Sequence, residues 1–304
     1  MQTSIAVDAG ERQIVVRGET SNEHIVEAMP GLNPCAPLAQ QWAQAIETFL
    51  DLHPDCEPGE VGVSTTPLLH ATAHDLLALL AERGVRRVAV VPDGVAAYLG
   101  ALGDRHGAVI HASTVTVCFA CGPAGDAQVD GWGPIFGNAG SAFWIGRNAI
   151  EAGLRGLDGR RQLTALTDLV RADFPSLDHD YLDLQASPGF VPRIAAYAAK
   201  VDALAATDRV AANILDKAAA HLSEAVQAAI RRAGLTRPDP PRVVGVGTVF
   251  ESDRVRTRFV DYLTLHWPSF ALTEPVGNEL DGAASLHTLS NAHPLFGRVS
   301  FAAR

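Results

Sequence analysis

Hydrophobic and polar residues alternate along the first third of the chain in blocks that predict alternating strands and helices. Short apolar runs bounded by turn residues predict buried strands, and apolar residues spaced three and four positions apart predict amphipathic helices. The strands are expected at 4–7, 13–17, 61–64 and 87–92, and the helices at 38–50, 76–83 and 94–102. Residues 8–12 are expected to form a turn and residues 30–37 a loop. This alternation is typical of an α/β half-domain.

The rest of the chain carries a similar pattern with a larger share of helix. A strand is expected over 114–120, followed by a glycine-rich loop and a long helical region from about 141 to 232. Breaks in that region are expected at 158–159, 174–175 and 187–189. After a proline-rich linker, we expect a strand at 242–246, helices at 252–263 and 278–289, and an extended piece at 270–273. With 304 residues, the chain is long enough for two domains that each bury a core.

Composition narrows the class of protein. Hydrophobic residues make up 47% and charged residues 19% of the chain, which is typical of a globular protein. No apolar run reaches the roughly 18 to 20 residues that cross a bilayer. The first strand follows the N-terminus without a basic, cleavable leader, so we expect a cytoplasmic protein with no membrane partner. The net charge of −10 argues against nucleic acid as a partner.

The segment from Gly131 to Gly146 is the most informative part of the sequence. It is rich in glycine, contains two tryptophans and runs directly into a predicted helix. Glycine lets the backbone approach a ligand closely, and the first N–H groups of a helix lack internal partners. Such a loop suits a polar small molecule. The alternative is a tight turn that packs its aromatic side chains into a core.

The order of residues in this segment resembles the GGWG…GDEGSAYWIG signature of the N-acetylglucosamine kinase and BadF/BadG/BcrA/BcrD-type ATPase family. The resemblance implies an α/β, two-lobed actin-like ATPase (ribonuclease H-like) fold with an interlobe cleft. It divides the chain into an N-terminal lobe of residues 1–108 plus 279–304 and a C-terminal lobe of residues 109–278. Asn138 and Ala139 stand where the family usually has Asp and Glu, so two negative charges are absent.

The resemblance implies ATP and Mg²⁺ as cofactors, and it assigns a first phosphate turn after the first strand. Asp8 would hold Mg²⁺ through water, and Gly10 matches a glycine of the family turn. The threonine of that turn is missing, and Glu11 adds a negative charge that the guanidinium of Arg12 could offset. The alternative is an ordinary hairpin turn.

The second phosphate turn departs from the family pattern, whereas the adenosine motif resembles it. Where the family has a Gly-Thr-Gly-Ser turn, this chain has Cys121, Gly122 and Pro123, which lack hydroxyls, and the proline lacks an N–H. Gly245 and Gly247 resemble the family's glycine pair beside adenosine. We expect these four cysteine and glycine positions to line the nucleotide.

Asp93 is the candidate catalytic base, because it follows a buried strand in a segment that resembles the family's Asn-Asp-(x)-Ala-Ala. A helix N-cap is the competing interpretation. Asn33 precedes a proline and resembles the amide of the family's sugar loop, although Asn-Pro also marks plain turns. The further sugar-binding candidates are Gly131, Trp132, Gly133, Asn138 and Ser141.

Three hypotheses follow. The first is an ATP-dependent sugar kinase that acts as a homodimer on an N-acetylated hexosamine or related amino sugar. The second is a catalytically impaired family member that acts as a sugar sensor or inert partner subunit. The third is an ATPase activator that carries a cluster at Cys118 and Cys121, which are otherwise two small buried residues of a strand.

Overall fold

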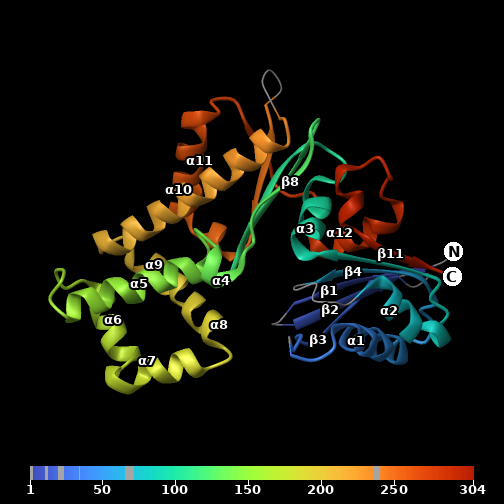
Figure 1. Cartoon of the computed structure of the whole chain (residues 1–304), viewed down its shortest axis with the longest axis horizontal. Coiled ribbons are helices and arrows are strands. Elements are labelled where there is room, and N and C mark those ends of the chain that lie inside the picture. Colours follow the sequence, from blue (N-terminus) through green and yellow to red (C-terminus); the bar gives the residue numbers. More distant parts are fainter. Residues whose placement is uncertain (1–2, 11–12, 20–23, 34, 66–71, 236–239) are drawn as a thin grey trace. The chain divides into compact units, whose positions relative to one another are not determined.

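The chain forms two compact units in the computed structural model, which describes residues 3–10, 13–19, 24–33, 35–65, 72–235 and 240–304. Unit 1 contains Met1–His106 and Glu274–Arg304, and unit 2 contains Gly107–Thr273. In Figure 1, unit 1 is blue to teal and red, and unit 2 is green to orange. The cleft expected between two lobes stays a prediction.

Unit 1 is built on a mixed sheet that, over the described residues, has six strands in the order β11-β5-β4-β1-β2-β3. The strands are β1 (Thr3–Ala9), β2 (Gln13–Glu19), β3 (His24–Pro30), β4 (Pro58–Thr65), β5 (Arg87–Pro92) and β11 (Ser300–Ala303). Because β1, β4 and β5 run parallel, their carboxyl ends lie at one edge of the sheet. The four strands expected in this part of the sequence are confirmed, and β3 and β11 are additional.

Helices cover both faces of this sheet (Figure 1). They are α1 (Leu38–Leu52), α2 (Ala73–Leu79), α3 (Asp93–Leu102) and α12 (Glu279–Ser285). The amphipathic α1 and α2 cover the core that contains Trp42, Phe49 and Leu76. On the other face, α12 lies so close to α3 that a Cβ at Gly100 would fall 1.9 Å from the Asn278 carbonyl oxygen. The predicted helix at 76–83 is α2 followed by a short 3-10 helix.

Unit 2 is built on a second mixed sheet that, in the part of the chain described, has the order β10-β9-β6-β7-β8. Its strands are β6 (Gly107–Ala112), β7 (Thr116–Gly122), β8 (Gly125–Asp130), β9 (Arg242–Val246) and β10 (Ala271–Leu272). Strands β6, β7 and β8 form an antiparallel meander, and β9 lies parallel to β6.

The meander corrects the prediction of a single strand over 114–120. Strand β6 precedes that segment, and the chain turns at 113–115 before β7 begins. Strand β8 was missed because its acidic and amide residues break the apolar run that identifies a buried strand. The turn after the first strand of unit 2 is therefore 113–115 and not 120–125.

The helices of unit 2 are α4 (Gly133–Phe136), α5 (Ala142–Leu157), α6 (Ala165–Asp173), α7 (Leu177–Ala186), α8 (Phe190–Ala195), α9 (Tyr197–Leu204), α10 (Arg209–Arg232) and α11 (Asp253–His266). The breaks expected in the helical region at 158–159, 174–175 and 187–189 are confirmed. The long α10 contributes much of the core, including Leu215, Leu222 and Val226. Across the described residues, none of the helices has both the length and the apolar character needed to span a bilayer.

Candidate functional site

Polar side chains gather where the parallel strands of unit 1 end. Asp8 of β1 lies opposite Ser64 of β4, and the Ser64 hydroxyl donates to Asp8 Oδ1 at 3.0 Å. Ser64 in turn lies opposite Val91 of β5, two residues before Asp93. The fold thus brings Asp8 and Asp93, which are 85 positions apart in sequence, to the same edge of one sheet.

Two hydroxyl residues at this edge were not among the predicted site residues. Ser64 and Thr65 close β4 and are 0% and 1% exposed. The Thr65 hydroxyl has no hydrogen-bond partner among the described residues, although buried polar groups are normally paired. The sequence signal is the pair of hydroxyl residues at the end of an apolar strand.

Asp93 is the first residue of α3, and Pro92 occupies the N-cap position without a side-chain cap. The Asp93 carboxylate accepts a hydrogen bond from the Gly94 N–H at 2.6 Å. Since a carboxylate beside a helix N-terminus is stabilised by the helix dipole, Asp93 stands where negative charge is favoured. Both interpretations of Asp93 agree with this placement, which does not by itself assign a catalytic role.

The predicted turn at 8–12 is shorter than expected, because β1 continues through Asp8 to Ala9. Gly10 donates its N–H to the Gln13 carbonyl at 3.0 Å, and its own carbonyl accepts from the Leu32 N–H at 2.9 Å. This second bond ties the Asn33 loop to the end of β1. The Asn33 side chain accepts from the Cys35 N–H at 3.0 Å, which forms an Asx turn. Arg12 lies outside the described residues.

The carboxyl ends of β6 and β9 form a corresponding polar edge in unit 2. The Ser113 hydroxyl, just after β6, lies 3.2 Å from the Thr248 hydroxyl, just after β9. Gly247 has a φ of 99°, and a Cβ there would lie 2.4 Å from the Ala112 carbonyl oxygen. Only glycine fits this position without strain, and it lets the two strand ends meet. Neither Ser113 nor Thr248 was among the predicted site residues.

Cys121 and Gly122 are not part of this edge, which corrects their predicted place. Strand β7 runs antiparallel to β6, so Cys121 lies opposite Gly107 at the start of β6. Gly245 and Gly247 stand at the other end of the sheet. Cys121 and Cys118 are both 0% exposed, and burial raises the pKa of the Cys118 thiol. The two cysteines are core residues of a strand, which argues against a redox pair or cluster site.

The glycine-rich loop is held closed by the carboxylate of Asp130. Asp130 Oδ1 accepts from the N–H groups of Gly131 at 2.8 Å and Asn138 at 2.7 Å. Asp130 Oδ2 accepts from the Ala139 N–H at 3.1 Å. One carboxylate therefore joins the first and last parts of the loop.

Asn138 is fully buried within this loop. Its side-chain oxygen accepts from the Thr116 N–H at 3.3 Å, at the start of β7. Its side-chain nitrogen has no hydrogen-bond partner among the described residues. In this conformation the amide is directed at the protein backbone, so we interpret Asn138 first as a loop residue.

The loop ends at the N-terminus of α5. Ser141 is the N-cap, and its hydroxyl accepts from the Trp144 N–H at 3.0 Å. The next residue, Ala142, donates its N–H to the Ser113 carbonyl at 2.8 Å. The loop, the start of α5 and the Ser113 turn are consequently one hydrogen-bonded assembly.

The two tryptophans of the segment differ in exposure. Trp132 is 66% exposed and stands beside Gly133, which has a φ of 76°. Trp144 is partly buried and packs edge-on against His221, with ring centroids 5.1 Å apart. Trp132 is thus the tryptophan whose face is available to a ligand.

The side chains at the sheet edge of unit 1 carry the kind of ligand atom that a magnesium ion prefers. Mg²⁺ prefers oxygen ligands and usually keeps several waters, with one or two carboxylates and the substrate phosphates completing its shell. Asp8, Ser64 and Asp93 supply only oxygen donors. No group of three or more His, Cys, Asp or Glu residues suited to a metal occurs among the residues described.

The two mixed sheets with their helices define an α/β protein of the actin-like ATPase class. The chain belongs to the BadF/BadG/BcrA/BcrD ATPase family, whose sequence model matches residues 73–284. The family predicted from the glycine-rich segment is therefore confirmed.

Named relatives agree with this assignment. The chain is 26% identical over 202 residues to the N-acetylmuramic acid/N-acetylglucosamine kinase of Clostridium acetobutylicum, and the match covers 65% of this chain and 66% of that relative. A protein of Chromobacterium violaceum assigned as an N-acetylglucosamine kinase superposes with a TM-score of 0.70 at 20% identity, covering 93% of this chain and 98% of the other. Another from Porphyromonas gingivalis gives 0.71 at 16% identity, with 94% and 98% covered. These two structures show the shared fold.

Proposed function

We propose that this protein is an ATP-dependent kinase that phosphorylates an amino sugar of the N-acetylglucosamine type. Its family and the printed names of its relatives support this class of reaction. The observation that carries the proposal is the meeting of Asp8, Ser64 and Asp93 at one sheet edge, since phosphoryl transfer needs a base and a metal-binding oxygen close together.

Asp93 acts as the base in this proposal. A sugar hydroxyl gives its proton to the Asp93 carboxylate as its oxygen bonds to the γ-phosphorus of ATP. The bond from that phosphorus to the bridging oxygen breaks, and ADP leaves with the electron pair. The carboxylate also orients the hydroxyl, which positions it for in-line attack.

Asp8, with Ser64 bonded to it, would hold Mg²⁺ through water. The chemistry that such an ion would supply there is neutralisation of the negative charge that develops on the phosphates of ATP. The hydroxyl of Ser64 fixes the orientation of the Asp8 carboxylate at 3.0 Å and so limits the positions that its other oxygen can take.

In unit 2, the turn after β6 replaces the segment 120–125 as the proposed second phosphate loop. Ser113 supplies the hydroxyl that 120–125 lacks, and Thr248 stands beside it. Gly245 and Gly247 keep the end of β9 narrow, so that the nucleotide can lie against backbone.

The exposed ring of Trp132 is the proposed apolar surface for the sugar, because the C–H groups of a pyranose pack well on an aromatic face. Asn33 remains the proposed hydroxyl-binding amide of unit 1. Gly131, Gly133, Asn138 and Ser141 shape the loop that carries Trp132. A homodimer and a cytoplasmic location remain parts of the proposal.

The test is ADP release in a coupled assay with N-acetylglucosamine or glucose, with and without Mg²⁺. We expect turnover with the N-acetylated sugar, dependent on Mg²⁺, and a loss of about 10²–10⁴-fold in kcat for Asp93→Asn. Sugar affinity should stay close to the parent value. Asp55→Asn, an identical change at an exposed position of the same unit, is the control. Parent-like turnover of Asp93→Asn would remove Asp93 from the mechanism.

A further inference from the structure

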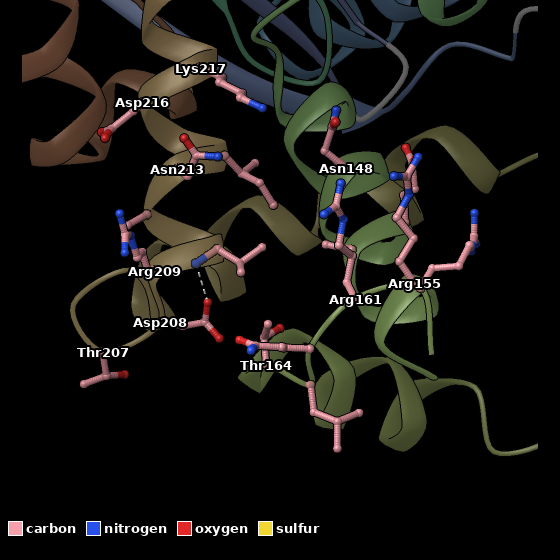
Figure 2. Close-up of a pocket in the computed structure, with 18 of the residues that line it drawn as sticks. Asn148, Arg155, Arg161, Thr164, Thr207, Asp208, Arg209, Asn213, Asp216 and Lys217 are labelled. Atoms are coloured by element: carbon pink, nitrogen blue, oxygen red, sulfur yellow. Dashed lines mark hydrogen bonds and ion pairs between the residues drawn. The ribbon is translucent and has the colours of Figure 1, made fainter. Parts of the chain in front are cut away.

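A large polar pocket lies in unit 2. It has a volume of about 1380 Å³ and lies between α5, the segment 160–164 and the first half of α10, with Arg254 of α11 at its border. Figure 2 shows α5 and α10 as its two walls. None of the residues proposed above to hold ATP, Mg²⁺ or sugar lines it.

The acidic residues that line the pocket are already engaged. Glu151 pairs with Arg155 at 2.6 Å on α5. Asp216 accepts two hydrogen bonds from Arg254, both at 2.8 Å. Asp208 caps α10 by accepting from backbone N–H groups at 2.7 and 3.0 Å. Glu151 and Asp216 are thus neutralised by arginines, and Asp208, whose partners are backbone N–H groups, is the lining carboxylate that keeps its negative charge.

Three cations of the lining, Arg161, Arg209 and Lys217, have no acidic partner among the residues that the structure describes. Lys217 extends from α10 toward α5, and Arg161 follows the α5 wall toward Asn148 (Figure 2). Arg209 points to the other side of α10 (Figure 2). In a protein of net charge −10, such an excess of cations around one cavity raises the local potential for an anion.

The chemistry of the lining selects the kind of anion. A guanidinium donates two parallel hydrogen bonds to a phosphate, and an ammonium adds a compact charge. Asn213 on α10 and Thr164, the N-cap of α6, add neutral donors. The volume admits a ligand larger than a single ion.

We propose that this pocket binds a small molecule bearing more than one phosphate charge, held by Arg161 and Lys217 at a site separate from the sugar and ATP. The proposal does not depend on the kinase activity, because it rests on the cavity and its unneutralised cations alone.

Calorimetric titration with inorganic pyrophosphate, without Mg²⁺ and at fixed ionic strength, tests it. We expect saturable binding to the parent protein and a loss of at least about tenfold in affinity for the Arg161→Gln/Lys217→Gln double variant. The charge-matched control is Arg171→Gln/Arg256→Gln, which removes two exposed cations, on α6 and α11, that pair with Asp168 and Asp253 and lie outside the pocket. It should bind like the parent.

A second variant separates charge from folding. Arg161→Lys/Lys217→Arg keeps both charges and should retain binding within about threefold of the parent. Thermal unfolding checks that each variant is folded. Absent binding to the parent, or parent-like binding by the Gln double variant, overturns the site. If the parent protein bound citrate as tightly as pyrophosphate, the assignment of the pocket to a phosphate ligand would be overturned.

Discussion

The carboxylate of Asp130 holds together the two ends of the glycine-rich loop. The family signature has glycine immediately before the Gly-Trp-Gly triplet, and Asp130 holds that position with a φ of 62°. The carboxylates of the signature are absent at Asn138 and Ala139, yet the Asp130 oxygens accept from the N–H groups of both residues. We interpret Asp130 as the positioning residue of this loop.

Asp130→Ala should loosen the glycine-rich loop, because it removes the acceptor of three backbone N–H groups and places alanine at a positive φ. We expect the KM for sugar to rise about tenfold and the loop to be cleaved faster in limited proteolysis. Asp130→Asn keeps one oxygen acceptor and tolerates this φ, so its effect should be smaller.

Asp168→Asn, an exposed change on α6, is the control for loop cleavage and KM. Identical KM values for the parent, Asp130→Asn and Asp130→Ala would show that the loop keeps its shape without the carboxylate.

The burial of His293 predicts that the protein loses stability in mild acid. It is 9% exposed, and its Nδ1 accepts from the Leu295 N–H, which requires a neutral ring nitrogen. Burial lowers the pKa of His293, Asp104 opposes the shift and His106 adds to it. Below about pH 6.5 the unfolded chain therefore takes up this proton before the folded one, and the free energy of unfolding falls.

Denaturant unfolding between pH 5 and 8 measures this effect. His293→Asn keeps an acceptor for the Leu295 N–H but cannot titrate, so its stability should fall less steeply below about pH 6.5, by under about 1.4 kcal/mol per pH unit. Above pH 7 the slopes should agree. His74→Asn, at an exposed position, should keep the parent slope. A parent slope in His293→Asn would contradict the assignment.

At the scale of elements, a continuous apolar run identified some strands but not all of them, since β6 was not predicted although it is buried almost throughout. Strand β5 is buried almost throughout, and its continuous apolar run matched the expected bounds. Strands β3 and β8 alternate or mix polar with apolar positions and were missed. Because β6 was not predicted, the second phosphate turn was assigned to residues 120–125 instead of 113–115. The pairing of Ser113 with Thr248 joins residues 135 positions apart and depends on sheet order, which no local pattern contains.

Gly247→Ala tests the junction of β6 and β9. Its Cβ would meet the Ala112 carbonyl oxygen at 2.4 Å with φ at 99°, so we expect a cost of about 1–3 kcal/mol and weaker nucleotide binding. Gly189→Ala is the matched control in unit 2, since φ is −93° there and the nearest atom is 3.9 Å from the added Cβ. Thermal unfolding and ADP titration compare them. Equal melting of both variants would show that the junction tolerates a side chain.

At the scale of the whole molecule, the two units differ in whether one continuous segment of the chain forms them. Unit 2 is the continuous segment Gly107–Thr273. Unit 1 needs both ends of the chain: α12 packs against α3 and β4, and β11 pairs with β5. At Gly62, a Cβ would lie 2.0 Å from the Ala283 carbonyl oxygen, so this face of the sheet is shaped to receive α12.

This difference predicts that the isolated segment 107–273 folds and that 1–106 alone does not. The first carries its whole sheet and the core around α10, so it should unfold cooperatively in a circular dichroism melt. The second leaves the apolar face under α12 and the edge of β5 uncovered, which favours aggregation. Joining 274–304 to 1–106 by a flexible linker should restore a cooperative transition. A cooperative melt of 1–106 alone would mean that α12 and β11 are additions to unit 1 and not parts of its core.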